Sequence, residues 1–217
     1  MTQHRFRLPE KRRTLLLPEN LPDRRVRVAF FDADQTLRNS RSGRPSPHGH
    51  SDLIVHERCF ARLQNLAEEK YLLAIVSNQA GIELGYIDHA EVEEAMQAML
   101  ITFAEKGILF NYYDYAEFYN EDRKPEPGMA WRLERLLDMQ GYAINWAASF
   151  MVGDAAWKRG HDQKPDGTPG TDHSNADRRF AENVARKHPG FGFFHPDHFF
   201  GRHLPGQQTG KPAEKTK

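Results

Sequence analysis

Short apolar runs alternate along the chain with longer segments whose apolar residues recur at helical spacing. The apolar runs are rich in β-branched and aromatic residues and predict strands over 26–31, 71–76, 112–119, 149–152 and 191–194. The segments with helical spacing predict helices over 60–67, 88–107, 127–139 and 175–188. This alternation is typical of an α/β fold, a three-layer sandwich around a mostly parallel, Rossmann-like sheet.

The segment 88–107 has the clearest helical pattern. Its apolar residues share one face and are Val92, Ala95, Met96, Met99 and Phe103. Asp88 is a favoured N-cap residue, and Gly107 is favoured just beyond a helix C-terminus. We therefore expect a helix with defined ends and one buried face.

The polar segments divide the chain into a leader, one domain and a tail. We expect a basic, extended arm over 1–24, a single folded domain over 25–204 and a disordered tail over 205–217. Within the domain, residues 39–51 and 157–173 are rich in glycine, proline and polar side chains and predict loops.

Composition narrows the class of protein. Hydrophobic residues make up 39% of the chain and charged residues 28%, as in ordinary globular domains. The longest aliphatic run, 72–76, is too short to span a membrane, and no secretory pattern occurs, so we expect a cytoplasmic protein without membrane partners. A single cysteine, Cys59, excludes an internal disulfide and a zinc cage made of thiolates.

The formal net charge is zero, which argues against affinity for nucleic acid through a broad electrostatic field. Residues 1–27 nevertheless hold eight basic and three acidic residues, a local excess of 8 − 3 = +5. This stretch is either a solvated leader or a patch that seeks polyanions.

Chemically active side chains follow the ends of the predicted strands. Asp32 and Asp34 follow the first strand, Ser77 the second and Asp154 the fourth, while Lys124 lies in the loop after the third. Ligands of parallel α/β sheets bind at the carboxyl ends of the strands, so we expect these five side chains to share one site.

These residue types suit phosphoryl transfer. One carboxylate of the Asp32–Asp34 pair can attack phosphorus while the other protonates the leaving oxygen; alternatively the pair only caps a turn. With Asp154 nearby, the carboxylates would repel one another unless they bound a cation such as Mg²⁺. Ser77 offers a hydroxyl to a phosphoryl oxygen, and Lys124 offsets negative charge in the transition state.

The order Asp32-x-Asp34-x-Thr36, Ser77, Lys124 and Gly153-Asp154 resembles the four motifs of the haloacid dehalogenase-like (HAD-like) phosphatase superfamily. The resemblance implies Asp32 as nucleophile and Asp34 as general acid and base, with Ser77 and Lys124 also catalytic. It further implies Mg²⁺ bound by Asp32, the Asp34 main-chain carbonyl and Asp154. We expect substrate contacts from Thr36, Asn78 and Arg123, which lie within or beside these motifs. The intervals between the motifs leave no room for a large cap domain.

Finer features are similar to the 3′-phosphatase domain of polynucleotide kinase/phosphatase. They are Arg41-Ser42-Gly43, Asn78-Gln79-Ala80-Gly81-Ile82, Arg123-Lys124-Pro125, the stretch 172–183 and the ending 195–200. The resemblance implies a DNA 3′-phosphatase of repair whose substrate is a phosphorylated nucleic-acid 3′ end. Asp177 then either supports the metal through water or is only an acid in the first turn of a helix.

Two residues depart from this family. Gln35 stands where glycine is usual, which affects the turn after Asp34. Trp157 also replaces a glycine, and is either a base-stacking platform or a buried anchor. A group of basic residues forms either a groove for a nucleic-acid backbone or ordinary solvated charge; they are Arg38, Arg41, Arg44, Arg123, Lys158 and Arg159.

Competing hypotheses remain open. The main alternative is a small-molecule phosphatase of the histidinol-phosphate or heptose-bisphosphate type, although such enzymes commonly carry a zinc loop of cysteines that one Cys59 cannot build. A zinc site on His48, His50 and His56 is disfavoured because no thiolate accompanies them. A catalytically silent interaction module is disfavoured because the motifs are intact apart from Gln35.

Overall fold

The computed structural model describes residues 8–9, 11–156 and 174–201. Within them a parallel sheet of six strands has the order β5-β4-β1-β7-β8, with β6 paired to the start of β1. The strands are β1 (Arg25–Phe31), β4 (Tyr71–Asn78), β5 (Tyr112–Ala116), β6 (Ala143–Ile144), β7 (Phe150–Val152) and β8 (Gly192–Phe194). The predicted parallel α/β sheet is thus confirmed, although β5 ends three residues earlier than expected.

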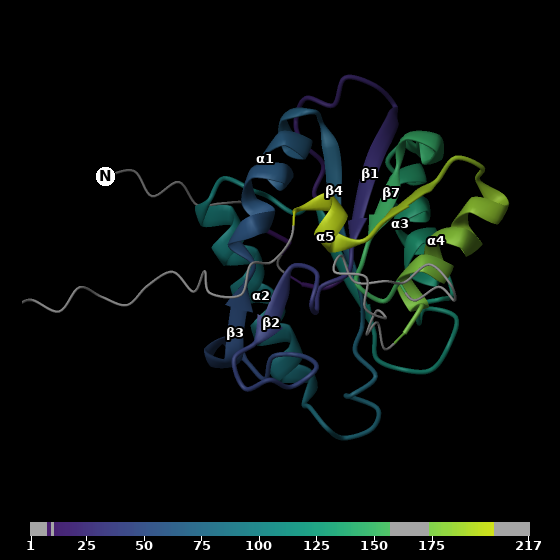
Figure 1. Ribbon diagram of the computed structural model, residues 1–217. Helices are drawn as coiled ribbons and strands as arrows, with labels where there is room; N and C mark the ends of the chain where they lie inside the picture. Colours follow the sequence, from purple (N-terminus) through teal and green to yellow (C-terminus); the bar gives the residue numbers. More distant parts are fainter. Residues whose placement is uncertain (1–7, 10, 157–173, 202–217) are drawn as a thin grey trace, which may run out of the picture.

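Helices cover both faces of the sheet (Figure 1). Helices α1 (Phe60–Glu68) and α2 (His89–Glu105) lie on one face, and α3 (Gly128–Asp138) and α4 (Ala176–Lys187) on the other. The short elements are α5 (Pro196–Phe199) and the 3₁₀ turns η1 (His50–Asp52), η2 (Glu57–Cys59) and η3 (Trp146–Ala148). The predicted three-layer sandwich is confirmed, and α2 begins with the capping box of Asp88 and Glu91.

Strand β1 is buried on both faces because it lies in the middle of the sheet. Val28 and Phe30 point into the core under α3 and α4, whereas Ala29 and Phe31 point into the core under α1 and α2. A strand with two buried faces reads as a continuous apolar run, which explains why its sequence pattern is so clear. This central position brings Asp32, which follows β1, to the middle of the sheet's carboxyl edge.

A small hairpin lies between β1 and α1. Strands β2 (Arg38–Ser40) and β3 (Leu53–Val55) pair antiparallel beside α2 (Figure 1). The expectation that 39–51 is entirely loop is therefore wrong at its start, because each strand is too short to leave a pattern of alternation. Asp52 organises the turn by accepting hydrogen bonds from the N–H groups of Ser42 and His48.

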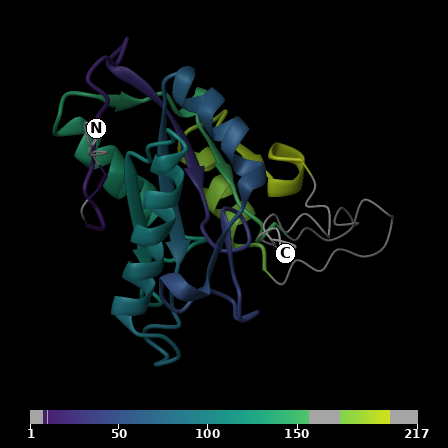
Figure 2. The same cartoon turned by 90° about the vertical axis from the view of Figure 1, so that its left-hand side faces the viewer.

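The described part of the arm packs against the domain (Figure 2, purple). The Arg13 N–H donates to Tyr113 O, and the Leu16 N–H donates to Asn111 O, each at 2.9 Å. Leu15 and Leu17 pack on the core under α3. The described residues of the arm, 8–9 and 11–24, form no helix or strand, but the expectation of a solvated leader is wrong for them.

Two arginines of the arm pair with acids of the domain. Arg13 Nε lies 3.0 Å from Asp114 Oδ1, and Arg12 pairs with Glu117. Six residues form this network of ion pairs, which we call the arm cluster: Arg12, Arg13, Arg132, Asp114, Glu117 and Asp122. Because internal acids neutralise Arg12 and Arg13, these two residues do not form the alternative polyanion-seeking patch.

Several expectations fall on residues outside the described ranges. They concern the start of the arm, the loop 157–173 with Trp157, Lys158 and Arg159, and the tail 205–217. Among the described helices, none combines the length and the apolar character needed to cross a membrane.

Candidate active site

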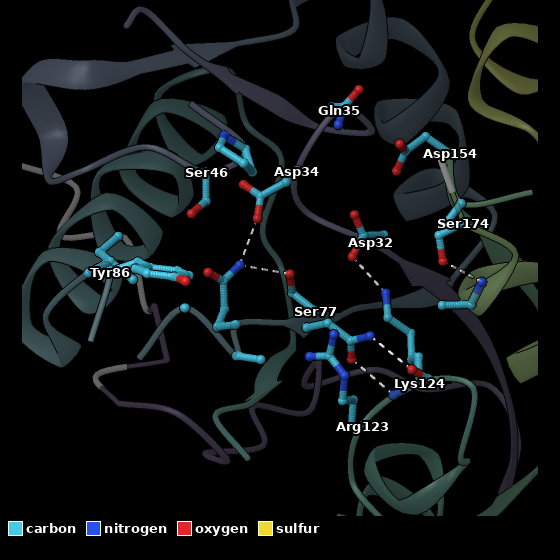
Figure 3. Close-up of a pocket in the computed structure, with 18 of the residues that line it drawn as sticks. Asp32, Asp34, Gln35, Ser46, Ser77, Tyr86, Arg123, Lys124, Asp154 and Ser174 are labelled. Atoms are coloured by element: carbon cyan, nitrogen blue, oxygen red, sulfur yellow. Dashed lines mark hydrogen bonds and ion pairs between the residues drawn. The ribbon is translucent and has the colours of Figure 1, made fainter. Parts of the chain in front are cut away.

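A cavity of about 620 Å³ opens at the carboxyl edge of the sheet (Figure 3). Residues from four separate segments of chain meet there, as the strand-end argument predicts. The expected site residues that line it are Asp32, Asp34, Ser77, Asn78, Arg123, Lys124 and Asp154. Thr36 is the expected site residue that does not line it.

Lys124 connects two buried carboxylates. Its Nζ lies 2.6 Å from Asp32 Oδ1 and 2.7 Å from Asp177 Oδ1, and it also donates to Val76 O at 2.7 Å. Burial alone would lower the pKa of Lys124, but the carboxylates of Asp177 and Asp32 raise it to about 12. Lys124 is therefore a fixed positive charge beside Asp32.

Three carboxylates converge on one point. One oxygen each of Asp32, Asp154 and Asp177 lies within 4.8 Å of the others. We name these three residues together with Lys124 the catalytic cluster; its formal charge is −3 + 1 = −2. Burial, followed by the charges of Asp32 and Asp177, raises the pKa of Asp154 to about 9, and burial also raises the pKa of Asp32.

This donor set fits a divalent cation. Like charges in a buried site repel strongly unless a counter-charge lies between them, and a single lysine leaves two negative charges unbalanced. Carboxylate oxygens are hard ligands of the kind that Mg²⁺ prefers. The cluster of Asp32, Asp154 and Asp177 is the one such group of potential metal ligands in the described part of the chain.

Gly153 allows Asp177 to approach Asp154. A Cβ at Gly153 would lie 2.3 Å from Asp177 Oδ2, so any side chain there would displace that carboxylate. Asp177 is 1% exposed, and its Oδ2 accepts a hydrogen bond from the Ala155 N–H at 3.0 Å. Although Asp177 lies in the first turn of α4, it is a buried member of the catalytic cluster and not only a first-turn acid.

Asp34 is held by two side chains that the sequence argument did not assign to the site. Its carboxylate accepts from Arg38 Nε at 2.9 Å and from Gln79 Nε2 at 2.6 Å. Gln79 also donates to Ser77 Oγ at 3.0 Å, which leaves the hydroxyl proton of Ser77 for another acceptor. Burial raises the pKa of Asp34 even though Arg38 opposes the shift. The sequence signals for Gln79 were its place just after a strand end and its membership in the segment Asn78-Gln79-Ala80-Gly81-Ile82.

The structure corrects the expectation for Arg38 and explains the departure at Gln35. Arg38 is fully buried and ion-paired with Asp34, so it belongs neither to a surface groove nor to the solvated charges. Gln35 has φ = 61°, a left-handed conformation that glycine adopts more easily, which explains why glycine is usual at this position. Its N–H donates to Arg38 O at 2.7 Å and closes the turn.

Thr36 and Asn78 position other site residues. Thr36 is fully buried, and its Oγ1 accepts from the Asp154 N–H at 3.2 Å, so the expected contact with substrate does not match its place beneath the site. Asn78 does line the cavity, where its side chain also bonds both the N–H and the C=O of Lys124, each at 2.9 Å. This pair of bonds fixes the loop that carries the lysine.

The three histidines considered for zinc contact different partners. His48 and His50 face Glu91 and Glu94 of α2, whereas His56 is buried against Thr36 O at 3.1 Å. Within the described ranges these histidines do not group into a metal site.

Comparison with known proteins adds a decisive observation. The sequence model of one family, described as polynucleotide kinase 3 phosphatase, matches residues 27–200. The chain belongs to the polynucleotide kinase 3 phosphatase family. It is a HAD-like phosphatase and thus a phosphoric monoester hydrolase.

The relatives include two kinds of phosphatase. A probable D-glycero-D-manno-heptose-1,7-bisphosphate 7-phosphatase from Thermoplasma volcanium is 28% identical over 133 residues, 59% of this chain and 86% of that protein. The bifunctional polynucleotide phosphatase/kinase of Schizosaccharomyces pombe is 30% identical over 181 residues, 80% of this chain but 37% of that protein.

Solved structures share the fold. A putative HAD-like phosphatase from Mesorhizobium loti aligns with a TM-score of 0.62 and 17% identity, covering 82% of this chain and 76% of that one. The D,D-heptose 1,7-bisphosphate phosphatase of B. bronchiseptica, complexed with magnesium and phosphate, aligns with a TM-score of 0.50 and 16% identity, covering 75% and 99%.

Proposed function

We propose that this protein is a Mg²⁺-dependent phosphomonoesterase that forms a phospho-aspartate on Asp32 and acts on polynucleotide 3′ ends, most naturally those of DNA. The observation that supports this most is the convergence of Asp32, Asp154, Asp177 and Lys124 within one cavity. Removal of 3′-phosphates would place the protein in DNA repair.

The cation would be held by the oxygens of the catalytic cluster. Asp32, Asp154 and the main-chain carbonyl of Asp34 are the expected ligands, and Asp177 lies close enough to support them through water. Bound Mg²⁺ would neutralise the phosphate and orient it for in-line attack. The remaining chemistry belongs to the side chains.

In the first step Asp32 acts as the nucleophile. A carboxylate oxygen of Asp32 bonds to phosphorus while the bond from phosphorus to the ester oxygen breaks. Lys124 Nζ, 2.6 Å from Asp32 Oδ1, opposes the rise that burial causes in the pKa of Asp32, so it favours the ionised nucleophile and orients it. The hydroxyl of Ser77 donates a hydrogen bond to a phosphoryl oxygen, and the positive charge of Lys124 offsets the negative charge that grows on the phosphoryl group.

Asp34 acts as the general acid in the first step and as the general base in the second. Burial raises its pKa, which favours a protonated acid able to give its proton to the departing alkoxide oxygen. In the second step water attacks the phosphorus of the phospho-aspartate, and the Asp34 carboxylate accepts the water proton. The products are the alcohol, inorganic phosphate and regenerated Asp32.

The family match favours a polynucleotide substrate. It covers residues 27–200, and the bifunctional polynucleotide enzyme matches 80% of the chain, against 59% for the heptose-bisphosphate phosphatase from T. volcanium. In the described part of the chain no large cap domain is inserted between the strands that carry the site, which suits a large substrate. Small-molecule phosphatase activity is the second candidate because several relatives hydrolyse heptose bisphosphates by name.

One assay separates the two candidates. Phosphate release is measured from a 3′-phosphorylated oligonucleotide and from a panel of sugar and amino-alcohol phosphates, each with Mg²⁺ and with excess chelator. We expect a higher kcat/KM for the oligonucleotide and no turnover with chelator. Strong preference for a panel member would reject the polynucleotide substrate, and full activity with chelator would reject the dependence on Mg²⁺.

A further inference from the structure

Large apolar side chains gather at the mouth of the catalytic cavity. Tyr86 is 74% exposed, Tyr119 64% and Leu84 51%, and all three line the cavity. Figure 3 shows Tyr86 on the opposite side of the cavity from Asp154 and Lys124. The cavity therefore has a charged end, where phosphate chemistry would occur, and an aromatic end.

The backbone on which Tyr86 sits is fixed. The Tyr86 N–H donates to Gly81 O at 2.8 Å, and the next residue, Ile87, is 6% exposed and anchored in the core. Gly81 packs closely on Ile87, since a Cβ there would lie 3.1 Å from the Ile87 side chain. The exposed ring is thus carried by a rigid turn, not by a loose loop.

Tyr119 is fixed from two directions. Its N–H donates to Glu83 Oε2 at 3.2 Å, which links its loop to the turn that carries Tyr86. The guanidinium of Arg123 lies over its ring, 4.1 Å from the centroid. Arg123 Nη1 is buried and has no hydrogen-bond partner among the described residues. An arginine stacked on an exposed tyrosine beside a phosphate site is a combination suited to nucleic acid.

We propose that Tyr86 and Tyr119 are stacking platforms for nucleobases at the unpaired 3′ end of the substrate strand. This inference rests on the proposed function, because it requires a nucleic-acid substrate whose terminal phosphate lies at Asp32. Rings with exposed faces accept any base, so the platforms select for single-stranded ends without selecting for sequence. A cavity of about 620 Å³ has room for a nucleoside beyond the phosphate itself.

The stacking residues determine specificity, so their test compares two substrates. The first is a 3′-phosphorylated single-stranded oligonucleotide, and the second is identical except that its terminal nucleotides lack bases. For the wild type we expect a kcat/KM about tenfold higher on the first substrate, the scale of stacking one base. In Tyr86→Ala and Tyr119→Ala this ratio should fall toward one, mainly through KM, and Tyr86→Trp should restore it.

Phe118→Ala is the matched control. Phe118 precedes Tyr119 and is 51% exposed, but it does not line the cavity, so its removal should leave both substrates' kcat/KM unchanged. A substrate ratio in Tyr86→Ala and Tyr119→Ala equal to that of the wild type would overturn the stacking inference alone. A wild type that hydrolyses p-nitrophenyl phosphate but not the oligonucleotide would overturn the polynucleotide substrate as well.

Discussion

Two clusters of charged side chains lie beside the same sheet and differ in their net formal charge. The arm cluster beside β5 contains three arginines and three acids and sums to zero. The catalytic cluster at the end of β1 contains three carboxylates and Lys124 and sums to −2. Both have buried aspartates, Asp114 in the first and Asp32 in the second.

This difference in net charge distinguishes a cluster that stabilises the fold from one that can bind a ligand. In the arm cluster each acid has an arginine within the fold, so the cluster fastens the arm to the domain and needs nothing further. In the catalytic cluster the unbalanced negative charge raises the free energy of the metal-free protein, and a divalent cation would lower it. The same residue types therefore stabilise one region and prepare the other to bind a ligand.

The largest expected effect comes from Asp32→Asn. An amide neither attacks phosphorus nor binds a cation as a carboxylate does, so turnover of p-nitrophenyl phosphate should fall to the background rate. Asp114→Asn makes the same chemical change in the arm cluster and should leave the kcat of the folded enzyme unchanged, because Asp114 is buried away from the cavity. Undiminished turnover by Asp32→Asn would mean that another residue is the nucleophile.

Lys124→Ala should have the next largest effect. It removes the positive charge beside Asp32 and should lower kcat at least about 100-fold, the scale of losing one electrostatic stabiliser of the transition state. Arg132→Met in the arm cluster removes a partly buried cation that, like Lys124, pairs with two carboxylates, and it serves as the control. Near-full activity of Lys124→Ala would show that the lysine motif has been misplaced.

Removal of metal should make stability depend on pH. The folded-state pKa of Asp154 is raised to about 9, above its value in the unfolded chain, so the folded state holds this proton more tightly. Stability of the metal-free protein should therefore fall as the pH rises from about 4 toward about 9. The shift for Lys124 acts only above its ordinary value of 10.5 and leaves this window unaffected.

Thermal unfolding at pH 6 and pH 9 checks this prediction. The melting temperature without Mg²⁺ should be lower at pH 9, and added Mg²⁺ should raise it more at pH 9 than at pH 6. Asp154→Asn should be less sensitive to both changes, because it removes the titrating carboxylate. An equal effect of Mg²⁺ at both pH values in the wild type would contradict the assignment of the cation to this cluster.

The smallest effect is expected in the arm cluster. Arg132→Met leaves Asp114 with weaker pairing and should lower the free energy of unfolding by about 2 kcal/mol, less than for a fully buried pair because Arg132 is 19% exposed. Urea unfolding measures the loss, and kcat should stay at the wild-type value. A lowered kcat would show that the arm cluster acts on the site.

Strand ends were the most informative part of the sequence. The run before Asp32 is apolar on both faces, so a buried strand and its exit toward the carboxyl edge followed from pattern alone, whereas its central position did not. Arg38 and Thr36 were misjudged because nothing local marks an arginine as buried or a threonine as lying beneath a site. Both are decided by residues far along the chain or across a turn, such as Asp154 and Asp34.

The sequence by itself determined the sheet, its flanking helices and the set of side chains delivered to its carboxyl edge, because these depend on apolar periodicity within single segments. Only the tertiary structure decided which charges meet. Pairing of Arg12 with Glu117, and of Lys124 with Asp32 and Asp177, joins segments widely separated in sequence. The energy of a charge depends on its burial and its neighbours, and both exist only once the chain has folded.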